Sequence, residues 1–173
     1  EGEPLTETEL IQKAISSFRD REGQGTVNIN TNASRPESIP DLARAGLTSI
    51  RVSINSAREE AYTAYYRPES YTFAHVLDCI RTAKEHNIFV SLNYLYFPGV
   101  SDLEVEYQAL CELIHRTGVH FIQSRNLNLD PELYLHILPD VDSPAMGQAN
   151  LFQRLKRDFP HLGWGYFNPY LRD

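Results

Sequence analysis

The amino-acid sequence predicts an α/β fold made of parallel βα units that form part of a TIM-like barrel. The first observation is that four short segments rich in β-branched and aromatic residues alternate with longer segments of helical periodicity. Such alternation is typical of βαβ units with parallel strands and right-handed crossovers. The second observation is that the strands have one apolar and one polar face. A doubly wound sheet, covered by helices on both sides, has nearly continuous apolar strands instead, so the polar face favours a barrel lining.

The first helix is predicted over residues 5–21, where apolar residues recur at helical spacing. Thr6 and Glu9 have the Thr-x-x-Glu spacing of a capping box, which predicts that this helix begins at Thr6. Gly23 interrupts the helical pattern. The alternating stretch TVNINTNAS, residues 26–34, then predicts the first strand.

The central part of the chain continues this alternation. A short helix is predicted over 36–45 and ends at Gly46, a favourable residue after a helix terminus. The segment TSIRVSIN, 48–55, predicts the second strand. The amphipathic segment 71–87 predicts a helix, and IFVSLNYLYF, 88–97, predicts the third strand.

The last βα unit comprises a helix predicted over 102–116, which Gly118 ends, and a fourth strand predicted over 120–129. We therefore assign residues 1–138 to a partial barrel and residues 139–173 to a C-terminal extension.

The C-terminal extension is predicted to contain one helix, from Ser143 as its N-cap, with Pro144 in the first turn, to about Asp158. An aromatic-rich tail follows. Its aromatic side chains are open to two interpretations, a stacking platform for a substrate or packing that covers the flank of the barrel, and we favour the second. These residues are Trp164, Tyr166, Phe167 and Tyr170.

Composition excludes several classes of function. The formal net charge is −7 and no Lys/Arg-rich block occurs, so nucleic acid is not an expected partner. No apolar run is long enough to cross a membrane. With two cysteines only, Cys79 and Cys111, a disulfide scaffold is excluded and a reducing cytoplasm is expected. Both lie in helical, apolar surroundings typical of buried cysteines, and no His or Cys pair has metal-ligand spacing, so we expect no metal ligands.

Hydrogen-bonding side chains recur on the polar face of successive strands. Because strand side chains alternate, Ile50, Val52 and Ile54 share one face of the second strand and the intervening residues share the other. One interpretation is a polar ligand near the carboxyl ends of the strands. The alternative, that these side chains satisfy loop backbone, stays open for the strand-end residue Asn32. The polar residues are Asn28, Asn30, Asn32, Arg51, Ser53, Asn55, Ser91 and Asn93.

Several stretches together resemble the radical S-adenosylmethionine (SAM) enzymes. GEP, residues 2–4, resembles the end of the Gly-Gly-Glu-Pro motif of that family, with Glu1 in place of a glycine. NINTNAS resembles its third strand, with Ala33 in place of the usual Gly, and LARAGLTSIRVSINSAREEAYTAYYRP resembles the fourth strand and the segment that follows it. NYLYFPGVSDLEVE and RNLNLDPE are similar to the fifth and sixth strand ends. The resemblance covers residues 1–138 and implies strands three to six of a six-stranded barrel.

The resemblance also implies how this chain would contact SAM. Glu3, with the backbone of Gly2, would receive the methionyl ammonium through a charge-assisted hydrogen bond. Ser53 and Asn55 would bind the ribose or the methionyl carboxylate. Arg67 would pair with that carboxylate, and its alternative role is to cap an exposed loop.

Further along the chain, the resemblance implies that Asn93 borders the nucleoside and that Asn126 and Asn128 lie near the adenine or the substrate. Asn30 and Asn32 of the first predicted strand complete the implied cofactor-binding set. The substrate itself is not identified.

The cysteine motif of the family is absent from the sequence. Its [4Fe–4S] cluster is held by a Cys-x3-Cys-x2-Cys loop, and Cys79 and Cys111 cannot replace three thiolates. The expectation is therefore a C-terminal fragment of an iron–sulfur oxidoreductase that cleaves SAM reductively to a 5′-deoxyadenosyl radical. The full-length parent would use SAM and the cluster as cofactors, whereas the fragment alone is expected to be inactive. A strand edge left open at TVNINTN, residues 26–32, predicts self-association.

Two alternatives stay open at this point. One is a non-catalytic binding or regulatory module that has a barrel fold. The other is an ordinary TIM-type aldolase or isomerase, which has little support because no strand ends in a lysine for a Schiff base and no acidic or His set for a divalent metal emerges.

Overall fold

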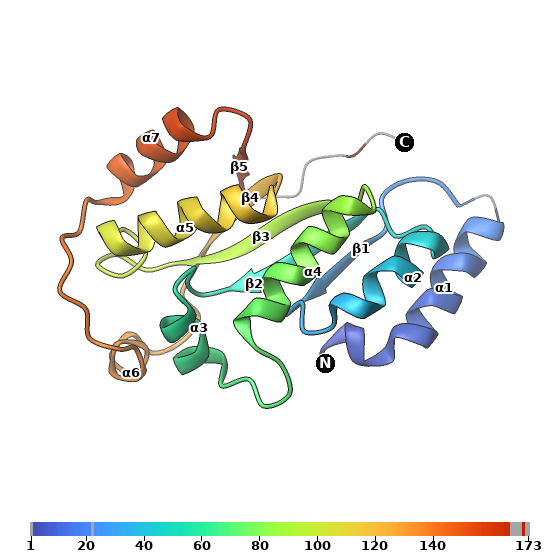
Figure 1. The fold of residues 1–173 in the computed structure, drawn as a ribbon, viewed down its shortest axis with the longest axis horizontal. Helices are drawn as coiled ribbons and strands as arrows, with labels where there is room; N and C mark the ends of the chain where they lie inside the picture. The colour runs from blue at the N-terminus through green and yellow to red at the C-terminus, as the bar shows by residue number, and fades with distance from the viewer. Residues whose placement is uncertain (1, 22, 167–170, 172–173) are drawn as a thin grey trace.

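The computed structural model describes residues 2–21, 23–166 and 171, and within them five strands form one parallel sheet. The strands follow one another in chain order across the sheet, β1-β2-β3-β4-β5, so each pairs with the next along the chain (Figure 1). This arrangement confirms the predicted α/β fold of parallel βα units. The strands are β1 (Asn28–Thr31), β2 (Ser49–Ile54), β3 (Phe89–Tyr96), β4 (Phe121–Asn126) and β5 (Gly163–Gly165).

The helices after β1 connect consecutive strands, whereas α1 precedes β1. The helices α1, α2, α4 and α5 lie on one side of the sheet (Figure 1). Gly46 and Gly118 end α2 and α5, as predicted. Their φ values of 108° and 62° lie in the left-handed region of backbone conformation, which favours glycine. The helices are η1 (Pro4–Glu7), α1 (Thr8–Asp20), η2 (Pro36–Ser38), α2 (Ile39–Ala45), α3 (Glu59–Tyr66), α4 (Phe73–Glu85), α5 (Glu104–Thr117), α6 (Pro131–Ile137) and α7 (Gln148–Asp158).

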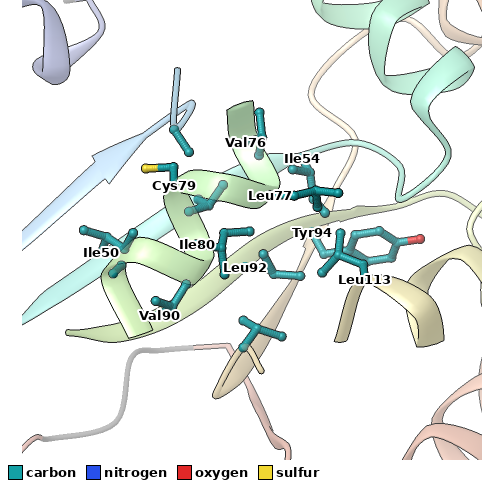
Figure 2. Packing of buried hydrophobic residues seen from close by; sticks show 14 of the residues in the cluster. Ile50, Ile54, Val76, Leu77, Cys79, Ile80, Val90, Leu92, Tyr94 and Leu113 are labelled. Atoms are coloured by element: carbon teal, nitrogen blue, oxygen red, sulfur yellow. The ribbon is translucent and has the colours of Figure 1, made fainter. Parts of the chain in front are cut away.

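The hydrophobic core lies between this helical layer and the apolar face of the sheet. Figure 2 shows side chains of α4 pointing toward those of β2 and β3. Residues of alternate positions in β2 and β3, such as Val52 and Leu92, are fully buried there, together with Ile80 of α4. Burial of about 25 cal/mol per Å² of apolar surface stabilises this layer. The opposite, polar face of the sheet is therefore left for other contacts.

The predicted capping box at the start of the first helix is wrong. Thr6 donates its hydroxyl proton to the carbonyl of Glu3 at 2.6 Å and caps no helix N–H. The chain instead begins with η1, whose N-cap is Glu3, and α1 starts at Thr8. Glu3 is the N-cap in place of Thr6 because its carboxylate also accepts hydrogen bonds from the end of β1. Sequence spacing does not reveal this tertiary contact.

The C-terminal extension differs from the prediction in two ways. The helix begins at Gln148 and not near Ser143, because Ser143 and Pro144 accept backbone hydrogen bonds from the first turn of α5. In addition, Trp164 belongs to β5, a strand that the sequence did not predict, and its ring packs on Phe152 of α7. Of the aromatic tail, Phe167 and Tyr170 lie outside the described residues. The short helices α3 and α6 were not predicted either.

Two observations bear on the predicted partners. No helix among residues 2–21, 23–166 and 171 is long and apolar enough to cross a membrane. β1 lies at one edge of the sheet and pairs with β2 alone among the described strands. An open edge can pair with another chain, so self-association stays a prediction.

The ring of His120 should make folding pH-dependent. Its Nδ1 accepts a hydrogen bond from the Val90 N–H at 3.0 Å, its Nε2 lies 2.7 Å from Nζ of Lys84, and Phe89 stacks on the ring. Burial, followed by the charge of Lys84, lowers the pKa of His120 below its ordinary value. The unfolded chain therefore takes up a proton first, and the free energy of unfolding should decrease as the pH falls below about 6.5.

Urea unfolding of the wild type and of His120→Gln at several pH values checks this prediction. Between about pH 7.5 and pH 5, the free energy of unfolding should decrease less in the variant than in the wild type, because a glutamine does not titrate. The same pH dependence in both proteins would contradict the role of His120.

Candidate cofactor-binding site

A pocket of about 510 Å³ opens on the polar face of the sheet, at the carboxyl ends of β2, β3 and β4. In parallel α/β sheets this end is where ligands bind, because the loops that follow the strands converge there. Five residues of the implied cofactor-binding set line the pocket. They are Ser53, Asn55, Asn93, Asn126 and Asn128.

A row of hydrogen bonds crosses three strands at the floor of this pocket. Asn93 donates from Nδ2 to Oγ of Ser53 at 3.2 Å, and its Oδ1 accepts from Nε of Arg125 at 3.3 Å. Arg125 also donates to Oε1 of Gln123 at 3.3 Å. The register explains the row, because Ser53 pairs with Asn93 and Asn93 pairs with Gln123 in the parallel ladder. The side chains are thereby held in fixed orientations toward the pocket.

The side chain of Asn55 lies at the end of β2 and offers a buried acceptor to the pocket. Asn55 is 1% exposed. Its Nδ2 donates a hydrogen bond to the carbonyl of Ala61 at 3.1 Å, and this bond joins the end of β2 to α3. Its Oδ1 is buried and accepts no hydrogen bond from the described residues. A buried polar atom in this condition is costly unless a ligand or water satisfies it.

The loop after β2 is held by the buried carboxylate of Glu106 on α5. This carboxylate accepts hydrogen bonds from the Ser56 hydroxyl, the Ala57 N–H at 2.6 Å, Nε of Arg58 at 3.1 Å and the Tyr94 hydroxyl at 2.8 Å. Glu106 therefore ties the loop that follows Asn55 to α5 and β3. This role of Glu106 was not predicted, since an acidic residue in the first turn of a helix is also typical of the protein surface.

Arg51, which the sequence places beside Ser53 on the polar face of the same strand, also lines the pocket. Three further lining residues were not predicted: Tyr65 and Tyr66 on α3, and Arg125 on β4. The two tyrosines could not be predicted, because α3 itself was not predicted.

The carboxylate of Glu3 closes the end of β1. Its oxygens accept hydrogen bonds from the Leu5 N–H at 3.0 Å, from the Thr31 hydroxyl and from the Asn32 N–H at 2.7 Å. The Asn32 side chain accepts from the Ser34 N–H at 3.0 Å, a local turn contact. Glu3 and Asn32 do not line the pocket described above.

Three other residues of the implied set also lie outside the lining of this pocket. Gly2 is exposed, Asn30 is exposed on β1 and accepts from Asn28 at 3.1 Å, and Arg67 is exposed at the end of α3 with φ 47°. Arg67 makes no ion pair with the described residues, so both of its predicted roles, pairing with the carboxylate of SAM and capping an exposed loop, stay predictions.

Ala33 adopts φ 58° and is fully buried at the end of β1. This backbone region favours glycine, which is the usual residue at this position in the family that the sequence resembles. The departure in sequence therefore leaves the local backbone conformation in place.

The cysteines are not placed to bind an iron–sulfur cluster. Cys79 is buried on α4, where burial raises its pKa to about 12, and Cys111 is half-buried on α5. Among the described residues, no three His, Cys, Asp or Glu side chains gather to hold a metal ion. The residues present therefore do not fit a [4Fe–4S] cluster, which needs thiolate ligands.

A family model described as the Radical SAM superfamily matches residues 1–109. No curated protein sequence matches the chain.

Solved structures are similar in fold. A domain of the pyruvate-formate lyase-activating enzyme from Bacteroides vulgatus has 14% identity and a TM-score of 0.64, with 95% of this chain and 94% of that chain covered. HydG, a maturase of the [FeFe]-hydrogenase, has 21% identity and a TM-score of 0.59, with 91% and 37% covered. Coproporphyrinogen III oxidase from Escherichia coli, described as a radical SAM enzyme, has 12% identity and a TM-score of 0.60, with 95% and 40% covered. The chain thus spans less than half of the last two proteins.

Proposed function

The chain belongs to the radical SAM superfamily, and from that premise we propose that it supplies part of the SAM-binding pocket of a radical SAM enzyme. The nucleoside of SAM would lie at the carboxyl ends of β2, β3 and β4. The observation that carries this proposal is the row of hydrogen bonds from Ser53 through Asn93 to Arg125, beside the unpartnered Oδ1 of Asn55.

The donor set fits the nucleoside half of SAM. Ser53 and Asn93 offer hydroxyl and amide groups for ribose hydroxyls, and the buried Oδ1 of Asn55 offers an acceptor. The rings of Tyr65 and Tyr66 at the side of the pocket offer an apolar surface for the adenine, with Asn126 and Asn128 at its rim. SAM, when bound, supplies one-electron chemistry through its adenosyl group. The residues of this chain bind and orient it.

Glu3 is proposed to position the end of β1 and to receive the ammonium of SAM. A carboxylate has about four acceptor positions, and three are taken by Leu5, Thr31 and Asn32. One position is therefore compatible with the ammonium. The thiolates for the iron–sulfur cluster are not among the residues of this sequence, so we derive no step through the cluster. The two free cysteines support a reducing compartment such as the cytoplasm.

Binding of 5′-deoxyadenosine to the isolated chain tests the proposal without the cluster. Ser53→Ala should weaken binding about 5- to 10-fold in isothermal titration, because one hydrogen bond contributes about 1 kcal/mol. The matched control is Ser17→Ala, an exposed serine of α1, which should bind as the wild type does. Equal affinity of Ser53→Ala and the wild type, or no binding by the wild type at millimolar nucleoside, would contradict the proposed site.

A further inference from the structure

Two guanidinium groups share the pocket on the polar face of the sheet. Arg51 comes from β2 and Arg125 from β4. Arg125 is held by Asn93 and Gln123 through hydrogen bonds of 3.3 Å, and its Cζ lies 4.2 Å from the centroid of the Tyr166 ring. Arg125 is therefore oriented before any ligand arrives.

Among the residues that the structure describes, no acidic side chain forms an ion pair with either arginine. The described residues that line the pocket include no Asp or Glu, and neither arginine takes part in the ion pairs of the described chain. Nε of Arg51 is buried and has no hydrogen-bond partner among the described residues. Burial, followed by the charge of Arg125, lowers the pKa of Arg51. Unpaired, partly buried charges of one sign are costly, and this pocket lies in a chain whose formal net charge is −7.

SAM does not supply the missing negative charge. Its sulfonium and ammonium are cationic and its one carboxylate is anionic, so its net charge is about +1 at neutral pH. A pocket with two unpaired guanidinium groups therefore opposes SAM as its sole ligand. A second, anionic ligand would offset both the arginines and the charge of SAM.

We propose that Arg51 and Arg125 bind an anionic group, a carboxylate or a phosphate, of the substrate that this enzyme acts on. The inference rests on the proposed function and names the substrate class for the same pocket. Guanidinium groups bind both anions through paired N–H donors, which fixes orientation as well as contributing affinity. Because Arg125 shares Asn93 with Ser53, the anion would lie next to the proposed nucleoside position.

Isothermal titration with inorganic phosphate and with acetate, at low ionic strength, tests the anion site. Arg51→Gln and Arg125→Gln should each weaken binding of the preferred anion at least 10-fold, and the comparison of the two probes tells a phosphate site from a carboxylate site. The control is Arg81→Gln, an exposed residue of α4 on the other side of the sheet, which makes the same change in net charge and should bind within about 2-fold of the wild type. Arg125→Lys, which keeps the charge, should retain more affinity than Arg125→Gln.

Titration of the same variants with 5′-deoxyadenosine separates this proposal from the proposed function. Arg51→Gln should leave affinity for the neutral nucleoside within about 2-fold, because Arg51 is not part of the row of hydrogen bonds from Ser53 to Arg125, whereas Ser53→Ala should weaken it. A wild type that binds the anion but not 5′-deoxyadenosine would refute the proposed function and leave the anion site standing. Anion binding that is equal in Arg51→Gln, Arg125→Gln and the wild type would overturn the anion site. Titration with SAM itself is the last comparison. If both glutamine variants lose SAM binding while their anion binding stays intact, the anion site is overturned, because the arginines would then bind the carboxylate of SAM.

Discussion

Replacing Glu106 with Gln should lower the free energy of unfolding by about 3 to 5 kcal/mol. The Glu106 carboxylate is fully buried and accepts four hydrogen bonds, from Ser56, Ala57, Arg58 and Tyr94. A glutamine has one acceptor oxygen, and its NH₂ group would meet donors on the other side. The guanidinium of Arg58, 5% exposed, would also lose its buried counter-charge.

Urea unfolding followed by circular dichroism measures this loss. Glu112→Gln on the same helix is the matched control, because its side chain is 69% exposed and its pair with Arg116 is worth at most about 0.5 kcal/mol. The double variant Arg58→Gln with Glu106→Gln should lose less than the sum of the two single variants, since each change removes the same buried pair. A Glu106→Gln protein within about 1 kcal/mol of the wild type would show that the loop after β2 does not depend on this carboxylate.

Glu3→Ala should lower the free energy of unfolding by about 2 kcal/mol, even in the absence of any ligand. The change leaves the Asn32 N–H and the Thr31 hydroxyl at the end of β1 without their acceptor, and it removes the side chain that caps η1. The amide proton of Asn32 should then exchange with solvent faster than in the wild type.

Glu9→Ala is the control for this variant, because Glu9 is an exposed carboxylate in the first turn of α1 and should contribute less than about 1 kcal/mol. If Glu3→Ala is as stable as the wild type and the exchange of Asn32 is unchanged, the positioning role of Glu3 is wrong, and the ammonium of SAM would be its only assigned partner.

The parallel arrangement of β1 to β4 could be predicted because the signals that specify it are local. Hydrophobic alternation marks the strands, and glycines with positive φ at Gly46 and Gly118 mark two helix ends. β5 could not, because a Gly-Trp-Gly segment has low intrinsic strand propensity. What favours it is tertiary: a side chain at residue 163 would collide with the ring of Phe121 on β4, so only glycine permits this pairing.

The site was predictable to the extent that it depends on strand alternation. Ser53, Asn55 and Asn93 were placed on one polar face, and they line one pocket. The positions of Arg125 and Glu106 depend on register and on the packing of α5 against the sheet, which spacing in one sequence does not specify. The motif at Gly2 and Glu3 suggested SAM contacts, whereas the structure places the Glu3 carboxylate on the end of β1.

In the proposed function, the carboxyl ends of β2, β3 and β4 hold the nucleoside of SAM. Nuclear magnetic resonance titration of the ¹⁵N-labelled chain with 5′-deoxyadenosine tests this placement residue by residue. We expect amide shift changes concentrated at Ser53, Asn55 and Asn93, which line the pocket on the polar face. Changes concentrated instead around Phe152 and Trp164, which line a neighbouring pocket beside α7 and β5, would contradict the proposal.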